Sequence, residues 1–226
     1  MDQDSIQEYV EIARSRGNAY RLLSRLWGTE VDAALLSELQ ATPFPELPEV
    51  PELDAAYRQL RGALSNTGPG MLQELGSDYA IMCLGANQND GADPYESVPR
   101  SPERIMMQDE WEQVLYLYAE LGLHRSDKTK EPEDHIALEL ECMAHLCDRA
   151  AEALESSSPE EAAWAHGKQI SFLDQHLLKW VPSFVSEVLR MARTDFYRAL
   201  AVLTREQLVL DRELLDQAQL PVAAQP

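Results

Sequence analysis

The six residues from Glu131 to Ile136 (Glu-Pro-Glu-Asp-His-Ile) place three carboxylates and a histidine at the start of a strongly periodic segment. Proline suits the first turn of a helix because it lacks an amide hydrogen that would be left unpaired there, and the helix dipole favours acids at that end. A protonated imidazole is disfavoured in this place unless neighbouring carboxylates hold it. Such a cluster could serve acid–base catalysis, metal binding or recognition of a cation.

The spacing around His135 argues against a metal site and against an active site. A di-iron helical bundle needs Glu-x-x-His pairs, yet no histidine in the chain follows a glutamate by three residues. No glycine-rich stretch ends in the Lys-Ser or Lys-Thr of a phosphate-binding loop, and Ser97 lacks the flanking glycines of a nucleophile elbow. We therefore expect no cofactor, no bound metal and no catalytic residue, and we do not expect an enzyme.

Composition narrows the class of partner. The 226 residues include 39 acidic and 19 basic side chains, and the net charge of −20 repels nucleic acid and favours cationic partners. The three cysteines, Cys83, Cys142 and Cys147, show no Cys-x-x-Cys spacing, which is typical of reduced thiols in the cytoplasm. The N-terminus lacks the pattern of a signal peptide, and no apolar stretch is long enough to span a membrane. We expect a soluble cytoplasmic protein that neither binds nucleic acid nor inserts stably into a membrane.

Apolar residues recur at helical spacing through almost the whole chain, and no segment combines strand-like alternation with turn signals. The sequence therefore predicts an all-α fold, a single compact multi-helix bundle over residues 1–219, with a flexible tail at 220–226. The small residues Ala13 and Gly17 in the first apolar stripe predict close packing by another helix. A polar run is compatible with a hinge near 125–131, and hence with either a monomer or a swapped homodimer.

Two regions interrupt the helical pattern. The stretch from 85 to 101 contains two glycines, two prolines and few apolar anchors, which predicts a long irregular loop. Ser101-Pro102-Glu103 then predicts a new helix start, with a capping serine and a first-turn proline. Farther on, Pro182 is expected to kink or break the helical run from Pro159 to Arg193.

A set of motifs in a fixed order runs from about residue 75 to residue 182. Its most specific part is the Glu-Pro-x-Asp-His element at 131–135, followed by a helix. The supporting elements are Tyr79 and Leu84, Pro94-Tyr95-Glu96-Ser97-Val98, Tyr118 with Gly122-Leu123, Glu139-Leu140 with Met143, and Phe172 with His176-Leu177 and Trp180. With these motifs the chain resembles the TorD/DmsD family, the cytoplasmic redox-enzyme maturation chaperones of molybdopterin oxidoreductases.

The resemblance implies both a function and a site. Proteins similar to this chain are all-helical and bind the twin-arginine signal peptide, or an equivalent N-terminal segment, of a molybdopterin oxidoreductase catalytic subunit. They hold this precursor for cofactor insertion before export. The family's peptide-binding residues correspond here to Pro132, Asp134 and His135, with Tyr95 and Glu96 as neighbours in the same region.

The chemistry of a twin-arginine leader suits these residues. Two guanidinium groups followed by an apolar stretch need carboxylates beside an exposed apolar groove. If the 85–101 loop folds back over the helix start, Asp134, with Glu96 or Glu131, can meet the arginines. The aromatic side chains that we expect to contribute to the groove are Tyr79, Tyr95, Trp111 and Tyr118.

Two other functions stay open at this point. One is a hydrolase or nucleotide-binding enzyme in which Asp134 and His135 form an acid–base pair, although no nucleophile, phosphate loop or metal set accompanies them. The other is an acidic scaffold protein without a leader-binding groove, because most acidic side chains serve only to keep a protein in solution.

Overall fold

The computed structural model describes residues 3–66, 68–84, 91–124 and 129–218 of the chain. These residues form helices and contain no β-strand, which confirms the predicted all-α fold. The helices are α1 (Gln3–Gly28), α2 (Ala33–Ala41), α3 (Pro51–Leu64), α4 (Met71–Cys83), α5 (Ser97–Arg100), α6 (Asp109–Leu121), α7 (Ile136–Glu155), α8 (Pro159–Phe172), the π-helical turn η1 (Leu173–Leu177), α9 (Leu178–Met191) and α10 (Asp195–Gln217).

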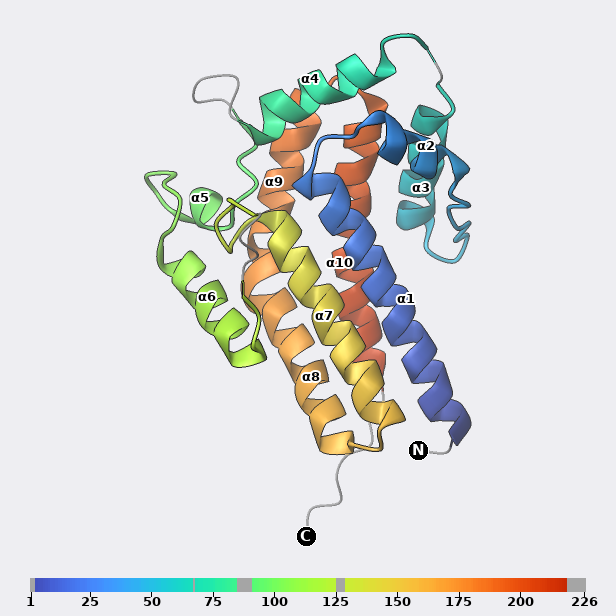
Figure 1. Ribbon diagram of the computed structural model, residues 1–226, viewed down its shortest axis with the longest axis vertical. Coiled ribbons are helices and arrows are strands. Elements are labelled where there is room, and N and C mark those ends of the chain that lie inside the picture. The colour runs from blue at the N-terminus through green and yellow to red at the C-terminus, as the bar shows by residue number, and fades with distance from the viewer. Residues whose placement is uncertain (1–2, 67, 85–90, 125–128, 219–226) are drawn as a thin grey trace.

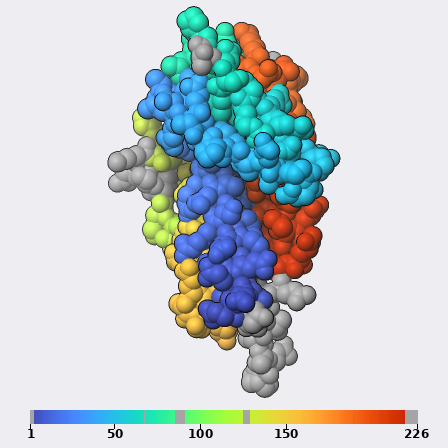
Figure 2. Space-filling view, turned by 90° about the vertical axis from the view of Figure 1, so that its right-hand side faces the viewer, coloured from blue at the N-terminus to red at the C-terminus, as the bar shows by residue number. Residues whose placement is uncertain are grey.

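The long helices run side by side along the longest axis of the molecule (Figure 1). α1 packs lengthwise against α7 and α7 against α8, while α3 and α9 pack against α10. Figure 2 shows the α2–α4 region gathered over one end of the molecule, beside α1 and α10. α6 lies along the opposite side of the bundle, next to α7 and α8 in the view of Figure 1. None of the described helices combines the length and apolar character that crossing a bilayer requires.

Small side chains let α1 and α7 approach closely. Ala13 is buried in a cluster with Ala150 and Ala151 of α7, and a Cβ added to Gly17 would lie 3.4 Å from the Cβ of Cys147. This confirms the predicted close packing across Ala13 and Gly17 and identifies α7 as the partner. α7 is therefore held rigidly along its length, and its N-terminal end is a fixed platform for the residues before it.

Aromatic side chains fill the centre of the bundle. Trp27 is fully buried, packs edge-on against Phe184 with ring centroids 4.9 Å apart, and donates its indole N–H to the Thr204 hydroxyl at 2.9 Å. The indole nitrogen is thereby satisfied, as a buried polar group must be. The other large fully buried aromatic side chains are Trp180, Tyr20, Tyr197, Phe172 and Phe196.

A buried ion pair ties α1 to α10. The Arg16 guanidinium donates to both carboxylate oxygens of Asp211, at 2.9 Å for the longer contact, and to the side-chain oxygen of Gln169 at 2.6 Å. The Tyr20 hydroxyl also donates to Asp211, at 2.6 Å. Because both charges are withdrawn from water, each depends on the other for compensation.

The segment from Ser101 to Gln108 is a loop, so the predicted helix start at Ser101 is wrong. α6 begins at Asp109 instead. Arg104 and Met107 have φ of 53° and 59°, a left-handed conformation that a helix cannot continue through. A tertiary contact accompanies this conformation: the Met107 amide donates to the Ser97 hydroxyl at 3.0 Å rather than to a carbonyl one turn earlier.

The helical run from Pro159 to Arg193 is interrupted before Pro182 rather than at it. α8 ends at Phe172, the wide turn η1 follows, and Pro182 lies inside α9. A proline ring clashes with the carbonyl four residues earlier, here Leu178, and the π-helical turn ends directly before that residue. The interruption thus lies upstream of the predicted position.

Several predictions fall on parts of the chain outside the described residues. These are the tail at 220–226, residues 125–128 of the hinge near 125–131, and residues 85–90 of the long loop. The described part of that loop contains the four-residue helix α5. A single domain over residues 1–219 stays a prediction.

The Arg16–Asp211 pair predicts a large loss of stability when its acid is removed. Asp211→Ala leaves the Arg16 cation buried without compensation, so we expect the free energy of unfolding to fall by about 3 kcal/mol or more. Glu155→Ala is the matched control, because Glu155 pairs with the α1 residue Arg14 at 2.7 Å while both side chains are about half exposed (47% and 48%). The control should lose less than about 1 kcal/mol in urea unfolding. Equal losses in the two variants would contradict the prediction.

Candidate functional site

The chain before α5 folds back onto the residues that precede α7. Tyr95 and His135 form an isolated antiparallel β-bridge. The Glu96 amide donates to the Asp134 carbonyl at 2.9 Å, and the Ile136 amide donates to the carbonyl of the residue before Tyr95 at 2.8 Å. The expected approach of the loop to the helix start is therefore confirmed for its described part.

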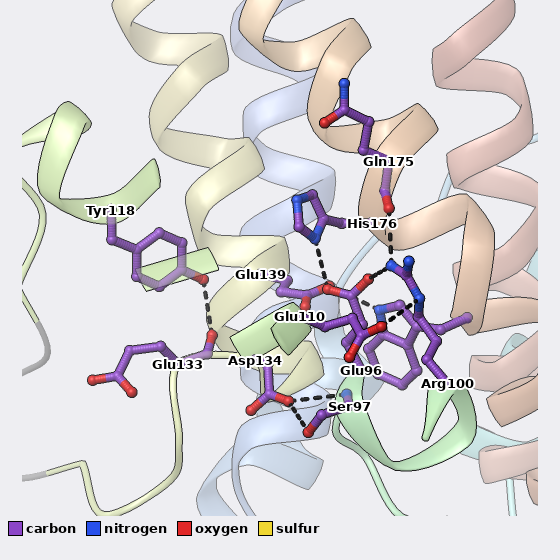
Figure 3. A network of polar contacts seen from close by, with 11 residues as sticks. Glu96, Ser97, Arg100, Glu110, Tyr118, Glu133, Asp134, Glu139, Gln175 and His176 are labelled. Carbon is purple, nitrogen blue, oxygen red and sulfur yellow. Dashed lines mark hydrogen bonds and ion pairs between the residues drawn. The ribbon is translucent and has the colours of Figure 1, made fainter. Parts of the chain in front are cut away.

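Asp134 fastens α5 to α7. Its side chain is fully buried, and Oδ2 accepts hydrogen bonds from the Ser97 amide at 3.0 Å and from the Ser97 hydroxyl at 2.5 Å (Figure 3). Burial raises the pKa of the Asp134 carboxyl, and the hydrogen bonds from Ser97 act in the opposite direction. Since α5 has only four residues, these bonds give it an anchor that its own short backbone cannot provide.

His135 is the N-cap of α7, and the helix begins one residue later than this histidine. Pro132 therefore precedes the helix rather than lying in its first turn, because a turn closed by a hydrogen bond from the His135 amide to the Pro132 carbonyl (3.1 Å) comes first. His135 Nδ1 accepts from the Ala137 amide at 3.1 Å, which requires an unprotonated nitrogen. Burial lowers the pKa of His135 to about 4, and the charge of Glu131 acts in the opposite direction. The imidazole is thus neutral, so no carboxylate is needed to hold a cation there.

Glu96 lies at the centre of a charged network. Its side chain is fully buried; Oε1 accepts from the Arg100 guanidinium, and Oε2 lies 2.7 Å from His176 Nδ1. Arg100 also reaches Glu110 at 3.3 Å and the Gln175 carbonyl at 3.0 Å (Figure 3). The network joins α5, α6 and η1.

Glu139 is a third fully buried carboxylate, one turn into α7. Its Oε2 accepts from the Trp180 indole at 2.9 Å. Burial, followed by the charge of Glu96, raises the pKa of Glu139 well above its usual value, which favours the protonated form. The sequence analysis placed Glu139 and His176 among the motifs of the resemblance but assigned neither of them to the binding site; a further signal was that each polar side chain interrupts an apolar helical stripe.

Glu131 and Glu133 are the acids of this turn that keep contact with solvent. Both are half-buried, as is Pro132 between them. Glu131 accepts from the Tyr95 hydroxyl at 2.5 Å, and Glu133 accepts from the Trp111 indole at 2.7 Å. Both of these bonds come from neutral groups.

The predicted aromatic residues do not all gather at this turn. Tyr95 and Trp111 are half-buried beside it, and buried Tyr118 donates its hydroxyl to the Glu133 carbonyl at 3.1 Å. Tyr79, in contrast, belongs to the core: it is buried, donates to the Trp27 carbonyl at 3.3 Å and packs against Tyr197. Tyr79 therefore lines no surface groove in this structure.

An exposed apolar segment that the sequence analysis missed is linked through Ser97 to Asp134 at the end of the turn. Ile105, Met106 and Met107 have exposed fractions of 52%, 47% and 51%. The Met107 amide is bonded to the Ser97 hydroxyl, the same hydroxyl that donates to Asp134. The signal in the sequence was the Ile-Met-Met run itself, which we had placed within the helix expected to start at Ser101.

Glu133 also lines a cavity of about 280 Å³. It is lined mainly by apolar groups, with Glu133 and Glu141 among them. The remaining lining residues are Tyr118, Leu123, His124, Thr129, Leu138, Cys142 and His145. The acidic turn thus borders a mainly apolar cavity at Glu133.

The described part of the chain offers no metal site and no activated thiol. No group of three or more histidine, cysteine, aspartate or glutamate side chains in it is arranged to hold a metal ion. The three cysteines are buried and free, and burial raises the pKa of each thiol, to about 12 for Cys83 and Cys147. They are therefore protonated at neutral pH and poor nucleophiles.

Comparisons with known proteins agree on one family. The family model described as nitrate reductase delta subunit matches residues 49–186. A protein from Shewanella sp. (strain MR-4) named chaperone protein TorD is 31% identical over 219 residues, which cover 92% of this chain and 98% of that protein. A protein of the same name from Vibrio cholerae is 30% identical over 219 residues, covering 94% of this chain and 97% of the relative.

The neutral His135 predicts a pH dependence of stability. Between pH 6.5 and about 4 the unfolded chain binds a proton at this histidine that the native state does not, so native stability falls as the pH drops through this window. His135→Asn keeps a good N-cap and removes that proton, and its stability relative to wild type should rise below pH 6.5 by up to about 1.4 kcal/mol per pH unit.

Thermal melts of wild type and His135→Asn at pH 8 and pH 5 measure this difference. The buried acids Asp134 and Glu139, whose raised pKa values act with the opposite sign, are present in both proteins and cancel. His124→Asn, which changes an exposed histidine, is the control and should follow wild type. A constant gap between His135→Asn and wild type at both pH values would refute a neutral, buried imidazole.

Proposed function

Because this chain belongs to the TorD family of molybdoenzyme maturation chaperones, we propose that it binds the twin-arginine signal peptide, or an equivalent N-terminal segment, of a molybdopterin oxidoreductase catalytic subunit. In the cytoplasm it would hold that precursor until the cofactor is inserted, before export. The observation that carries the proposal is the acidic turn at Glu131 and Glu133, which continues into Asp134 and is linked through Ser97 to the exposed apolar Ile105–Met107 segment.

The acidic turn supplies the attraction for arginine. Glu131 and Glu133 are two residues apart and partly exposed, and a guanidinium binds carboxylates through its planar set of donors. The net charge of −20 draws a cationic leader toward the protein over a longer range. Salt should therefore weaken the association, since exposed charges are screened.

The apolar stretch of a leader finds two surfaces next to this turn. One is the Ile105–Met107 segment, whose methionines adapt to side chains of different shape. The other is the cavity of about 280 Å³ beside Tyr118 and Leu138. Together they offer the hydrophobic contact that an amphipathic or helix-prone peptide requires.

Asp134 and His135, the buried residues of the family motif, support this surface without forming it. Asp134 holds α5 through Ser97, and His135 caps α7, so together they fix the conformation of the turn that carries Glu131 and Glu133. An acid–base role for Asp134 and His135 has no support in the geometry. Both side chains are buried, and the His135 nitrogen that could act as a base already accepts the Ala137 amide.

Removing the charge of the turn should weaken leader binding. We expect wild type to bind a twin-arginine peptide in the micromolar range, about −8 kcal/mol. The double variant Glu131→Gln with Glu133→Gln should bind about tenfold or more weakly, because charge-assisted hydrogen bonds are lost. Glu46→Gln with Glu49→Gln removes the same charge from two exposed glutamates of the α2–α3 connection and should bind like wild type.

Isothermal titration calorimetry with the peptide, and with a twin-lysine version of it, measures these affinities. Lysine lacks the planar fork of donors, so the twin-lysine peptide should bind less tightly than the twin-arginine peptide. If both peptides bound wild type equally, or if the two double variants lost the same affinity, the acidic turn would not be the arginine site.

The exposed apolar segment gives a separate prediction. Ile105→Ser with Met106→Ser should weaken binding of the full leader by about tenfold, because each side chain loses part of the roughly 1.5–3 kcal/mol available from full burial. A leader fragment truncated after the arginines should bind both proteins alike. The matched control is Ile12→Ser with Leu72→Ser, which alters two other exposed side chains (43% and 38%). Loss of fragment binding would indicate damage to the acidic turn instead of loss of apolar contact.

A further inference from the structure

The guanidinium of Arg100 lies among three acceptors from three different elements. Its Nη1 donates to Glu96 beside α5 and to the Gln175 carbonyl of η1 at 3.0 Å, and its Nε lies 3.3 Å from the Glu110 carboxylate of α6 (Figure 3). Two carboxylates and a carbonyl around one planar cation match the donor pattern of arginine better than that of lysine.

The acceptors are more deeply buried than the group they bind. The Glu96 side chain is 0% exposed, Glu110 is 16% exposed and Arg100 is 29% exposed. The second oxygen of Glu96 is held by His176 at 2.7 Å, so Oε1 keeps its direction whichever cation it meets. The cation therefore comes from the solvent side and lies on a preorganised carboxylate.

A cavity of about 290 Å³ between α6 and the α8–η1 region adjoins this site. Gln175 and His176 line both the cavity and the Arg100 network. The lining mixes polar and apolar groups, which suits the apolar stem and polar head of an arginine side chain; within it, Glu120 is already paired with Lys168 at 2.7 Å.

We propose that Glu96, Glu110 and the Gln175 carbonyl form a binding site for one arginine of the client leader. Arg100 is the internal occupant of this site and is displaced when the leader docks. The proposal rests on the proposed function, since it takes the twin-arginine leader as the ligand.

Arg100, as the internal occupant of the site, compensates the charge of a buried carboxylate. A fully buried Glu96 without a cation would carry an uncompensated charge, which is strongly unfavourable. Arg100 provides that cation in the resting protein, and a leader arginine replaces one guanidinium by another without leaving the carboxylate unpaired. Displacement is local, because Arg100 belongs to the four-residue helix α5 and is followed by the Ser101–Gln108 loop.

Chemical rescue tests the acceptor site without a leader. Arg100→Ala should be destabilised, and ethylguanidinium at a few times its Kd should raise its melting temperature by about 3 °C, whereas ethylammonium should not. Arg104→Ala is the matched control: Arg104 lies in the same segment, and its ion pair with Asp93 is exposed (52% and 39%). Lack of selective rescue, or equal rescue of Arg104→Ala and wild type, would overturn the site.

Leader titration tests the displacement. Arg100→Gln should bind the twin-arginine peptide about tenfold more tightly than wild type, the factor expected if Arg100 leaves the acceptors free about a tenth of the time. Arg104→Gln, with the same change in charge, should bind like wild type. Arg100→Lys, which keeps the charge but loses the fork, is a second variant and should also bind more tightly. Circular dichroism of each variant checks that the helices are retained.

The outcomes separate this proposal from the proposed function. If wild type binds the leader while Arg100→Gln and Arg100→Lys bind it no more tightly, displacement is overturned and the proposed function stands. If wild type and every variant fail to bind the leader while ethylguanidinium still rescues Arg100→Ala, the proposed function is overturned, and with it the leader as the occupant of the site.

Discussion

The hydrogen bonds between Asp134 and Ser97 are the contact on which the rest of the site depends. One carboxylate oxygen accepts both the amide and the hydroxyl of Ser97, and that hydroxyl accepts the Met107 amide in turn. A single buried side chain thus connects the start of α7 to α5 and to the exposed loop that follows. Because α7 is packed along α1 through small residues, this chain of bonds ends on a rigid support. The acidic turn, the apolar loop and the Arg100 network are consequently held in one arrangement.

Three buried carboxylates close together pose an electrostatic problem that the structure solves in different ways. Asp134 is stabilised by hydrogen bonds from Ser97, and Glu139 by the Trp180 indole together with a raised pKa that favours its neutral form. Glu96 alone among the three is paired with a guanidinium. Burying several acids is costly unless each has such a partner, so this arrangement concentrates the demand for a cation at Glu96. This asymmetry makes the Arg100 contact more than a surface ion pair.

The proposed leader-binding surface and its support are therefore different sets of residues. Glu131 and Glu133 are partly exposed, whereas Asp134 and His135, which carry the family motif, are buried. The motif residues shape the backbone, and the partly exposed acids and apolar side chains around them provide the contacts of the proposed leader site. A chaperone that must recognise a cationic, partly apolar leader needs both kinds of group on one rigid support.

Helical periodicity and the small residues in the first stripe determined the all-α fold and the close packing of α1 on α7, because these patterns act locally or along one helix face. The order of motifs likewise determined the family, which the comparisons confirm. Only the tertiary structure decided which acids of the motif are buried, because burial depends on where the 94–97 segment and η1 come to lie. It also decided that Tyr79 is a core residue, that Ser101 begins a loop and that Arg100 meets Glu96. Each of these outcomes rests on contacts between segments that are distant in the sequence. The energies of such contacts outweigh local secondary-structure propensity, and the contacts produce no periodic pattern of residues in the sequence.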